Sequence, residues 1–333
     1  MLLVCGCARD KTERSIWRFA IEEVSGSVQD AYAQAFKERI ERATQGAVRV
    51  QIYPYGTLGS SDHTTEQLVG GLIQFAISSP GHLGTIMPEV QVFLLHFLFD
   101  PDNRVNERAL RDPALVQQLR QLYEEKGLAF LAAFPEGWQA WTTNRPINNP
   151  KDFSGFKMRV MTSPLLVQAY ALYGASPTPL PYGEVYGALQ LNMIDGQVNP
   201  IFAIEEMSFY EVTDWLILPR HAQYITTVVS NPAFLASLPA RLHRLVNDTT
   251  AELGGTIFSL QADYNRDRLA IIRKKKPGLH ILSLSPSERQ AFQRRSVRLR
   301  QWYVAQTGKR GQRLLQAIDG ALRSAKEALR ALP

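Results

Sequence analysis

Cysteine is almost absent from this chain of 333 residues, and its two copies, Cys5 and Cys7, both lie within the first seven positions. No disulfide framework and no cysteine-ligated metal site can therefore form in the body of the chain. The six histidines are dispersed and show none of the short spacings that metal ligands share. We therefore expect neither a metal nor another cofactor.

Catalytic motifs and long apolar runs are also lacking. The chain has no Gly-x-Ser-x-Gly, no His-Glu-x-x-His, no phosphate-binding loop and no Gly-x-Gly-x-x-Gly, and each of these would carry a specific chemistry. No run of ~18 apolar residues follows the first segment, which argues against a membrane-spanning helix. We expect a protein that is not an enzyme. A lyase or isomerase with an acid–base pair assembled between two lobes is the enzymatic alternative.

Positive charge is in modest excess, with a net charge of +6, and it is concentrated in residues 266–276 and 289–313. Leu, Ile, Phe and Trp recur between these charges at helical spacing, which is typical of solvated helix faces. Nucleic-acid binding would need a basic stripe together with a recognisable reader motif, and the sequence has none. We therefore expect no nucleic-acid partner.

The first residues resemble the end of a bacterial lipoprotein signal. In Val4-Cys-Gly-Cys7, small residues precede a cysteine of the kind that is lipidated after cleavage. The apolar stretch 1–4 is too short for a signal h-region, so we expect the natural start to lie upstream. We expect residues 1–12 to be a signal remnant and tether, with Cys7 anchoring a periplasmic protein to a bacterial membrane. Two incidental cysteines on a secreted, soluble protein are the alternative.

Length and periodicity predict two lobes of the α/β class. A chain of 333 residues exceeds the size at which one core usually divides. Strands alternate with helices, which is typical of mostly parallel sheets with crossover helices, and ligands of such sheets bind at the carboxyl ends of the strands. The expected strands are 15–22, 48–53, 74–78, 128–133, 158–160, 193–198, 222–230 and 279–282, and the expected helices are 28–44, 64–69, 164–173, 239–276, 286–307 and 310–331.

Seven short motifs follow one another along the chain. They are Tyr53-Pro-Tyr-Gly-Thr-Leu-Gly59, Leu95-His-Phe-Leu-Phe99, Thr143-Asn-Arg-Pro-Ile147 with Phe153-Ser-Gly-Phe-Lys-Met-Arg-Val160, Gly174-Ala-Ser-Pro-Thr-Pro179, Glu184-Val-Tyr-Gly-Ala-Leu-Gln190, Asp195-Gly-Gln-Val-Asn-Pro200 and Phe209-Tyr-Glu-Val212. Each motif alone is weak, but seven in order are specific. Over about residues 17–310 the chain resembles the extracytoplasmic substrate-binding proteins of TRAP (tripartite ATP-independent periplasmic) transporters, the DctP type.

The resemblance implies a two-lobed, periplasmic-binding-protein-like fold that closes on a small organic acid. The protein would deliver this ligand to TRAP-type membrane permease subunits driven by an ion gradient, and an accessory periplasmic lipoprotein is a further candidate partner. Lobe I would comprise residues 13–136 and 224–264, and lobe II residues 137–223 and 265–333. The long helix after Pro239 would span both lobes.

Arg159 and Asn199 are the leading candidates for ligand binding. A guanidinium at a strand end in a partly dry cleft grips a carboxylate through two parallel charge-assisted hydrogen bonds. By the resemblance, Arg159 takes the place of the family's carboxylate-clamping arginine, and Asn199 that of the asparagine that shares the carboxylate. From the residues alone, a surface arginine paired with an acid and a turn residue before Pro200 are the alternatives.

Four more positions are candidates for the ligand site. Tyr182 falls where the family often places an aromatic side chain, although a turn residue is the alternative. Thr162 has a hydroxyl within reach of a ligand, or caps the following helix. Ser79 takes a pocket position where some members carry a charged side chain. Glu22, which with Glu23 ends the first strand, would disfavour a second anionic group or receive a ligand amine. We expect at least one of these two glutamates to be a structural residue that faces solvent.

Gln139 marks a departure from the family pattern. Many members that bind dicarboxylates or sugar acids carry an arginine there, whereas this chain has a neutral amide between Trp138 and Trp141. A second negative charge would lack a partner, and an unpaired charge is costly to bury. We therefore expect an apolar monocarboxylate rather than a dicarboxylate, with Gln139 as a selectivity switch and Trp138 as a further ligand-binding residue.

Ligand-driven hinge closure is the mechanism that the resemblance implies. The alternative function is a lipid-tethered interaction protein that exchanges a hydrophobic ligand with a periplasmic partner. A ligand-dependent change in the scattering radius separates the two.

Overall fold

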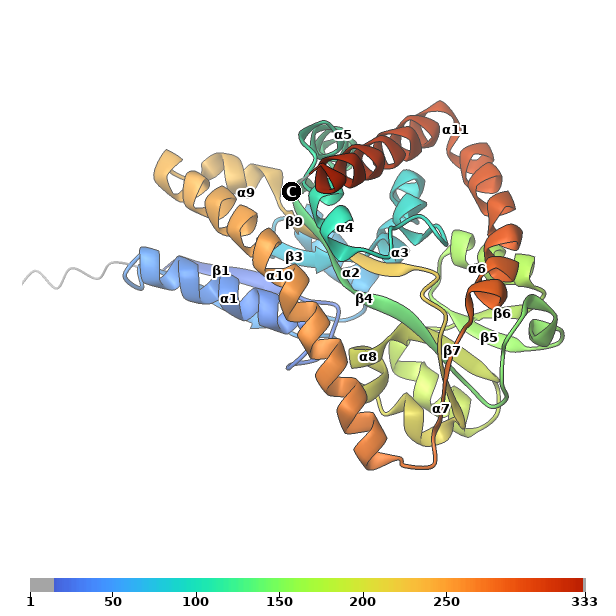
Figure 1. Ribbon diagram of the computed structural model, residues 1–333. Helices are drawn as coiled ribbons and strands as arrows, with labels where there is room; N and C mark the ends of the chain where they lie inside the picture. Colours follow the sequence, from blue (N-terminus) through green and yellow to red (C-terminus); the bar gives the residue numbers. More distant parts are fainter. Residues whose placement is uncertain (1–14, 332–333) are drawn as a thin grey trace, which may run out of the picture.

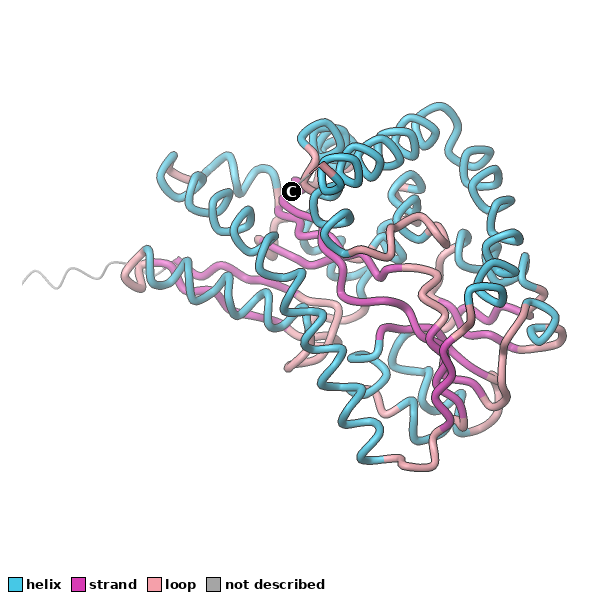
Figure 2. Tube along the Cα trace, in the orientation of Figure 1, coloured by secondary structure: helices cyan, strands magenta, loops and turns pink. Residues whose placement is uncertain are grey.

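The computed structural model describes residues 15–331, so that Cys7 lies outside the described part. These residues form a ten-stranded sheet in the order β2-β1-β3-β9-β4-β7-β5-β6, with β8 paired to β4 and β10 paired to β8 (Figures 1 and 2). The strands are β1 (Ser15–Ala20), β2 (Val48–Tyr53), β3 (Phe75–Ser78), β4 (Ala129–Thr143), β5 (Lys157–Val160), β6 (Ser176–Pro179), β7 (Gly196–Pro200), β8 (Trp215–Leu218), β9 (Gln223–Ser230) and β10 (His280–Ser283).

Helices surround this sheet. They are α1 (Val28–Ala43), α2 (Ser61–Val69), α3 (Pro80–Leu83), α4 (Asn103–Leu110), α5 (Pro113–Glu124), α6 (Pro164–Tyr173), α7 (Val185–Gln190), α8 (Ile201–Glu206), α9 (Pro232–Ser237), α10 (Ala240–Lys275) and α11 (Pro286–Arg330), with shorter 3₁₀ turns at η1 (Pro88–Leu94), η2 (Pro150–Phe153), η3 (Tyr182–Glu184) and η4 (Phe209–Val212). The α/β class predicted from the alternation of strands and helices is confirmed. The strand pairing is mixed, since β4 and β9 run antiparallel to their neighbours.

Strand β4 joins the two halves of the sheet. Its first part pairs with β9, and its second part pairs with β7 and β8. Its register against β9 shifts between Phe130 and Ala132 and again between Pro135 and Gly137. Gly137 has a φ of +151°, and a Cβ there would lie 2.6 Å from Asn265 Nδ2. A glycine is therefore required at this bulge, which bends the strand where the two halves meet.

Two long helices brace the sheet from outside. Helix α10 is 36 residues long and packs along β4, α1 and α8, so that it contacts both halves (Figure 1). Glu205 at the end of α8 forms ion pairs with Arg268 and Lys275 of α10, at 3.1 and 2.8 Å. Helix α11 curves over η1, α4 and α6 and is interrupted at Gly308, where φ is +61°. The sequence-based division into helices 286–307 and 310–331 corresponds to the two arms on either side of this kink.

Acid pH is expected to destabilise the fold through its buried histidines. His96 Nδ1 lies 2.7 Å from the Tyr173 hydroxyl, and burial lowers the pKa of His96 to about 3. In the unfolded chain, His96 binds a proton at the ordinary histidine pKa. The contribution of neutral His96 to the free energy of unfolding is therefore complete above about pH 6.5 and is lost as the pH falls toward 3. In urea titrations between these limits, His96→Gln should show a pH slope that is shallower by roughly 1.4 kcal/mol per pH unit. An unchanged slope would show that His96 is already charged in the folded protein.

Candidate functional site

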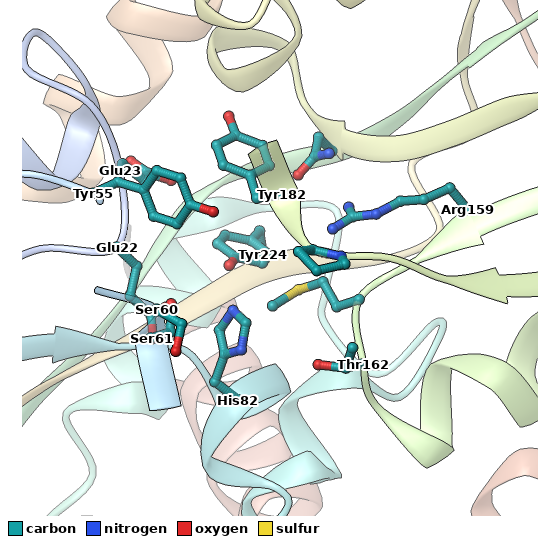
Figure 3. Close-up of a pocket in the computed structure, with 13 residues that line it drawn as sticks. Glu22, Glu23, Tyr55, Ser60, Ser61, His82, Arg159, Thr162, Tyr182 and Tyr224 are labelled. Carbon is teal, nitrogen blue, oxygen red and sulfur yellow. The ribbon is translucent and has the colours of Figure 1, made fainter. Parts of the chain in front are cut away.

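A cavity of about 120 Å³ lies between the two halves of the sheet (Figure 3). One wall comes from segments that follow β1 and β2, from α2 and α3, and from β9. The other comes from β5, β7 and the turn before α7. The lining residues are Glu22, Glu23, Tyr55, Ser60, Ser61, His82, Arg159, Met161, Thr162, Pro181, Tyr182, Asn199 and Tyr224. Several of them follow the carboxyl ends of parallel strands, which is the expected ligand position in such a sheet.

Arg159 on β5 supplies the positive charge of the cavity. Its Nε and Nη2 donate hydrogen bonds to the Leu180 carbonyl oxygen, at 3.0 and 2.7 Å, while the buried Nη1 donates to no acceptor among the described residues. The side chain is only 2% exposed, and burial lowers its pKa to about 10, so that it stays charged at neutral pH. A buried cation with an unused donor is costly unless an anion approaches it. The guanidinium is therefore preorganised for a carboxylate.

Asn199 on β7 lies on the same side of the cavity. Its amide nitrogen donates a hydrogen bond to Gln197 Oε1 at 2.5 Å, and Gln197 Nε2 in turn donates to Thr142 Oγ1 at 3.0 Å. This chain of hydrogen bonds holds the amide of Asn199 in one orientation. The turn position considered from the sequence is wrong, because Asn199 lies within the strand and pairs with Ala140 of β4.

Carboxyl groups line the opposite wall. Glu22 Oε2 accepts a hydrogen bond from the Ser79 backbone N–H at 2.9 Å. Burial, and next the proximity of Glu136, raises the pKa of Glu23 well above its ordinary value. Both glutamates are buried, so the expectation that at least one of them faces solvent is wrong. The cavity therefore places a fixed cation at one end and carboxyl groups at the other (Figure 3).

Tyrosines fill the space between the charged ends. Tyr55 and Tyr182 meet edge to face with their ring centroids 5.8 Å apart, and the Tyr55 hydroxyl accepts a hydrogen bond from Gly183 N at 3.4 Å. This contact connects the two walls. Burial raises the pKa of Tyr182 and of Tyr224 well above the ordinary phenol value, so both stay neutral. The middle of the cavity thus offers aromatic surface and neutral hydroxyl groups.

Comparison with known proteins identifies the family. Residues 19–306 match the model of the bacterial extracellular solute-binding proteins, family 7 (DctP). The chain belongs to this family. It is 37% identical to the ectoine/5-hydroxyectoine-binding periplasmic protein UehA of Ruegeria pomeroyi, with 92% of this chain and 90% of that protein aligned. It is also 37% identical to the ectoine-binding periplasmic protein TeaA of Halomonas elongata, with the same coverage.

Solved structures agree with the family assignment. The periplasmic ectoine-binding protein of the TeaABC TRAP transporter of Halomonas elongata has a TM-score of 0.89 at 35% identity, covering 93% of this chain and all of that one. A TRAP periplasmic solute-binding protein of Marinobacter aquaeolei in an apo open form has a TM-score of 0.87 at 40% identity, covering 91% and 99%. The periplasmic-binding-protein fold and the TRAP resemblance predicted from the sequence are thereby confirmed.

This family 7 protein is a periplasmic solute-binding component of a TRAP transporter and not an enzyme. Its implied partners are a small solute and the membrane subunits of the transporter. Within residues 15–331, no helix combines the length and apolar character needed to cross a bilayer. The same part of the chain has no group of three His, Cys, Asp or Glu side chains that could hold a metal ion.

Five of the eight ligand-binding residues predicted from the sequence line the cavity of this family 7 protein. They are Arg159, Asn199, Tyr182, Thr162 and Glu22. The helix-capping role considered for Thr162 belongs to Ser163, whose hydroxyl accepts a hydrogen bond from Leu166 N at 3.4 Å.

The other three predicted residues lie outside the cavity lining. Gln139 donates its backbone N–H to the Ala222 carbonyl, and Trp138 lies under the Arg220 guanidinium at 5.4 Å. Ser79 is fully buried at the start of α3. Contact between these three side chains and a ligand, and the selectivity role of Gln139, stay predictions.

Sequence reasoning missed most of the wall opposite Arg159. Tyr55, Ser60, Ser61, His82 and Tyr224 were not singled out as site residues, although all five line the cavity. A signal was available for Tyr55, which lies two residues after the end of β2 within a family motif. The position of Tyr224 depends on the pairing of β9 with β4, for which the sequence carries no local signal.

Proposed function

We propose that this protein captures a small zwitterion of the ectoine type and delivers it to TRAP membrane subunits. Ectoine is a small cyclic amidine with one carboxylate and one delocalised cation. The observation that carries the proposal is the polarity of the cavity, with Arg159 at one end and Glu22 and Glu23 at the other (Figure 3). Asn199 of β7 also lines the cavity. The names of two relatives that are each 37% identical support the same ligand class.

The opposed charges favour this ligand over a dicarboxylate. One carboxylate of either ligand would pair with Arg159, whose Nη1 is available. The second carboxylate of a dicarboxylate would then approach Glu22 and Glu23, and like charges in a buried site repel strongly. An amidinium at the same place would instead donate hydrogen bonds to a carboxylate. This extends the sequence-based hypothesis, in which Glu22 could receive a ligand amine.

An apolar monocarboxylate is the second candidate. The ring contacts of Tyr55 and Tyr182 give the cavity an aromatic wall, which favours an apolar ligand body. At about 120 Å³ the cavity is smaller than the range of roughly 300–1,000 Å³ typical of drug-sized ligands. Both candidate ligands are therefore small solutes. They differ in whether the ligand carries a cationic group that pairs with Glu23.

Titration calorimetry with a ligand panel tests the proposal. Ectoine and hydroxyectoine should bind most tightly, benzoate more weakly, and succinate least. Scattering should show a smaller radius of gyration with ectoine, because the ligand bridges the two walls and closes the hinge. Tighter binding of benzoate than of ectoine would overturn the zwitterion in favour of the apolar acid. Ligand binding without a change in radius would favour the lipid-tethered exchange protein.

Lipid attachment at Cys7 is part of the proposal. Val4-Cys-Gly-Cys7 and the polar segment 8–14 motivate it. When the gene is expressed from its natural start in its own host, mass analysis of the mature N-terminus should show diacylglyceryl-Cys7. Cleavage elsewhere, or an unmodified Cys7, would mean that no lipid tethers the protein.

A further inference from the structure

Glu136 lies behind the cavity wall and does not line it. It sits at the β4 bulge between Pro135 and Gly137, is 0% exposed, and contacts the side chain of the lining residue Glu23. Two other elements hold it in place. Gln29 of α1 donates a hydrogen bond to Glu136 Oε1 at 2.9 Å, and Asn265 of α10 donates to its backbone carbonyl at 2.7 Å. Glu136 is therefore fixed against Glu23 by the packing of three elements.

The contact between Glu23 and Glu136 joins two acceptors. A side-chain hydrogen bond joins Glu23 and Glu136, although neither carboxylate carries a donor of its own. Glu23 Oε2 and Glu136 Oε2 are buried without a donor among the described residues, and the nearby donors are the Gln29 backbone N–H beside Glu23 and the Thr226 hydroxyl beside Glu136. Two carboxylates this close in a dry site cannot both be ionised. We infer that Glu23 and Glu136 share one proton in the free protein and that the cationic group of a zwitterionic ligand replaces it. This inference rests on the proposed function.

The surrounding charges leave this proton in place. The acids that act on the pair are Glu22 after β1 and Glu206 of α8, and the phenols that interact with it are Tyr182 and Tyr224. Farther out, Glu205 of α8, Asp30 of α1 and Arg268 of α10 act on Glu206, and Arg159 of β5 acts on Tyr182. Arg268 is engaged by Glu205 at 3.1 Å and by the Gly26 carbonyl at 3.1 Å. Burial raises the pKa of Glu136 to about 7, and the pKa of Glu23 is raised as well. Acids thus outnumber cations around the pair.

The charge of the site balances when the proton is exchanged for the ligand. In the free protein, one proton and two carboxyl groups give the pair a charge of −1. On binding, the shared O–H bond breaks, the proton passes to the solvent, and an N–H of the ligand cation donates to Glu23. Two carboxylates and one cation again give −1. The buried pair therefore changes partner without a change in net charge, which avoids the cost of burying an additional charge.

Proton release makes ligand affinity depend on pH. A ligand that displaces one proton binds up to about tenfold more weakly for each unit by which the pH falls below the titration of the pair. Ligand affinity must fall as the pH falls, because acid restores the proton that competes with the ligand. Glu136→Gln retains the size of the side chain and supplies an N–H that can donate to Glu23. The variant should therefore bind ectoine with nearly pH-independent affinity.

Calorimetry in two buffers of different ionisation enthalpy measures the released protons directly. At slightly acidic pH, wild-type protein titrated with ectoine in phosphate and in bis-Tris should release close to one proton per ligand, and Glu136→Gln close to none. Glu206→Gln is the matched control. Burial raises the pKa of Glu206 to about 8, but Glu206 does not line the cavity. Proton release that persists in Glu206→Gln and is lost in Glu136→Gln would support the shared proton. Proton release that persists in Glu136→Gln and is lost in Glu206→Gln would overturn it.

Infrared spectroscopy of the ligand-free protein separates this inference from the proposed function. The spectrum at neutral pH should contain two protonated-carboxyl components, because Glu206 also carries a proton. Glu136→Gln should remove the component of the shared proton, and Glu206→Gln should remove the other component and leave this one in place. If ectoine fails to bind, the proposed function fails, and the component that depends on Glu136 still decides whether the pair holds a proton. Absence of that component, or ectoine binding without proton release, would overturn the inference.

Discussion

Arg159→Gln is expected to abolish tight ligand binding. The side chain is the positive charge in the cavity lining, and its Nη1 donates to no acceptor within the described residues. Removing one partner of a buried, hydrogen-bonded charge pair costs on the order of 2 to 5 kcal/mol, which corresponds to roughly a thirtyfold to several-thousandfold loss of affinity. Calorimetry with ectoine and benzoate should show this loss for both ligands, because both present a carboxylate. Binding within about threefold of wild type would rule out the clamp, since that is under 1 kcal/mol.

The choice of substitution at this position matters because Arg159 also has a structural role. A surface arginine was the alternative from the residues alone, whereas the structure buries the side chain and joins it to the Leu180 carbonyl by two hydrogen bonds. Alanine would leave that carbonyl without its partner and would open a void. Glutamine can still donate to Leu180, and Arg159→Lys preserves the charge without the planar fork. Thermal unfolding of each variant separates loss of stability from loss of binding.

Glu23→Gln is expected to weaken ectoine selectively. If the ligand cation pairs with this carboxylate, loss of a hydrogen bond between charged groups should cost about 1.5 to 3 kcal/mol, or roughly ten- to a hundredfold in affinity. Benzoate has no cation, so its affinity should be unchanged or improved. The ratio of the two dissociation constants is the quantity to measure, because a general disturbance of the cavity would weaken both ligands.

Glu22→Gln is the neighbouring control for that experiment. Glu22 also lines the cavity, but one of its carboxylate oxygens already accepts a hydrogen bond from the Ser79 backbone N–H. We expect a smaller loss of ectoine affinity than for Glu23→Gln. If Glu22→Gln has the larger effect, Glu22 is the main partner of the cation. If neither variant changes the ratio of ectoine to benzoate affinity, the carboxyl groups do not recognise the ligand.

Regular periodicity explains which elements could be predicted. Residues 48–53 alternate apolar and polar side chains and form β2, and the helical spacing in 164–173 corresponds to α6. Strand β4 was predicted only as 128–133 but continues to Thr143. Its second part contains Pro135 and Gly137, which are typical of turns, and it is buried on both faces, so that alternation disappears.

Site residues could be predicted where they lie near the end of a short strand and within a motif of the family. Arg159 lies near the end of a short strand, and Asn199 lies near the end of another, so their motifs carried the signal. Gln139 and Ser79 were chosen only because they take positions where other family members carry ligand-binding side chains, and neither lines the cavity. In a strand, neighbouring side chains point to opposite faces, so a motif cannot tell which of two adjacent residues faces a ligand until the register is known.

The sequence by itself determined the α/β class, most of the regular elements, the family, and the arginine and asparagine of one wall. Only the tertiary structure decided most of the opposite wall and the pairing of Glu23 with Glu136, which are 113 positions apart. The local sequence predicts helices and strands through their periodicity, and turns through the residues that favour them. The contact between these two carboxyl groups instead depends on the β4 bulge, on the packing of α1 and α10 around it, and on the exclusion of water. Burial raises the pKa of both groups, and burial is a property of the folded chain.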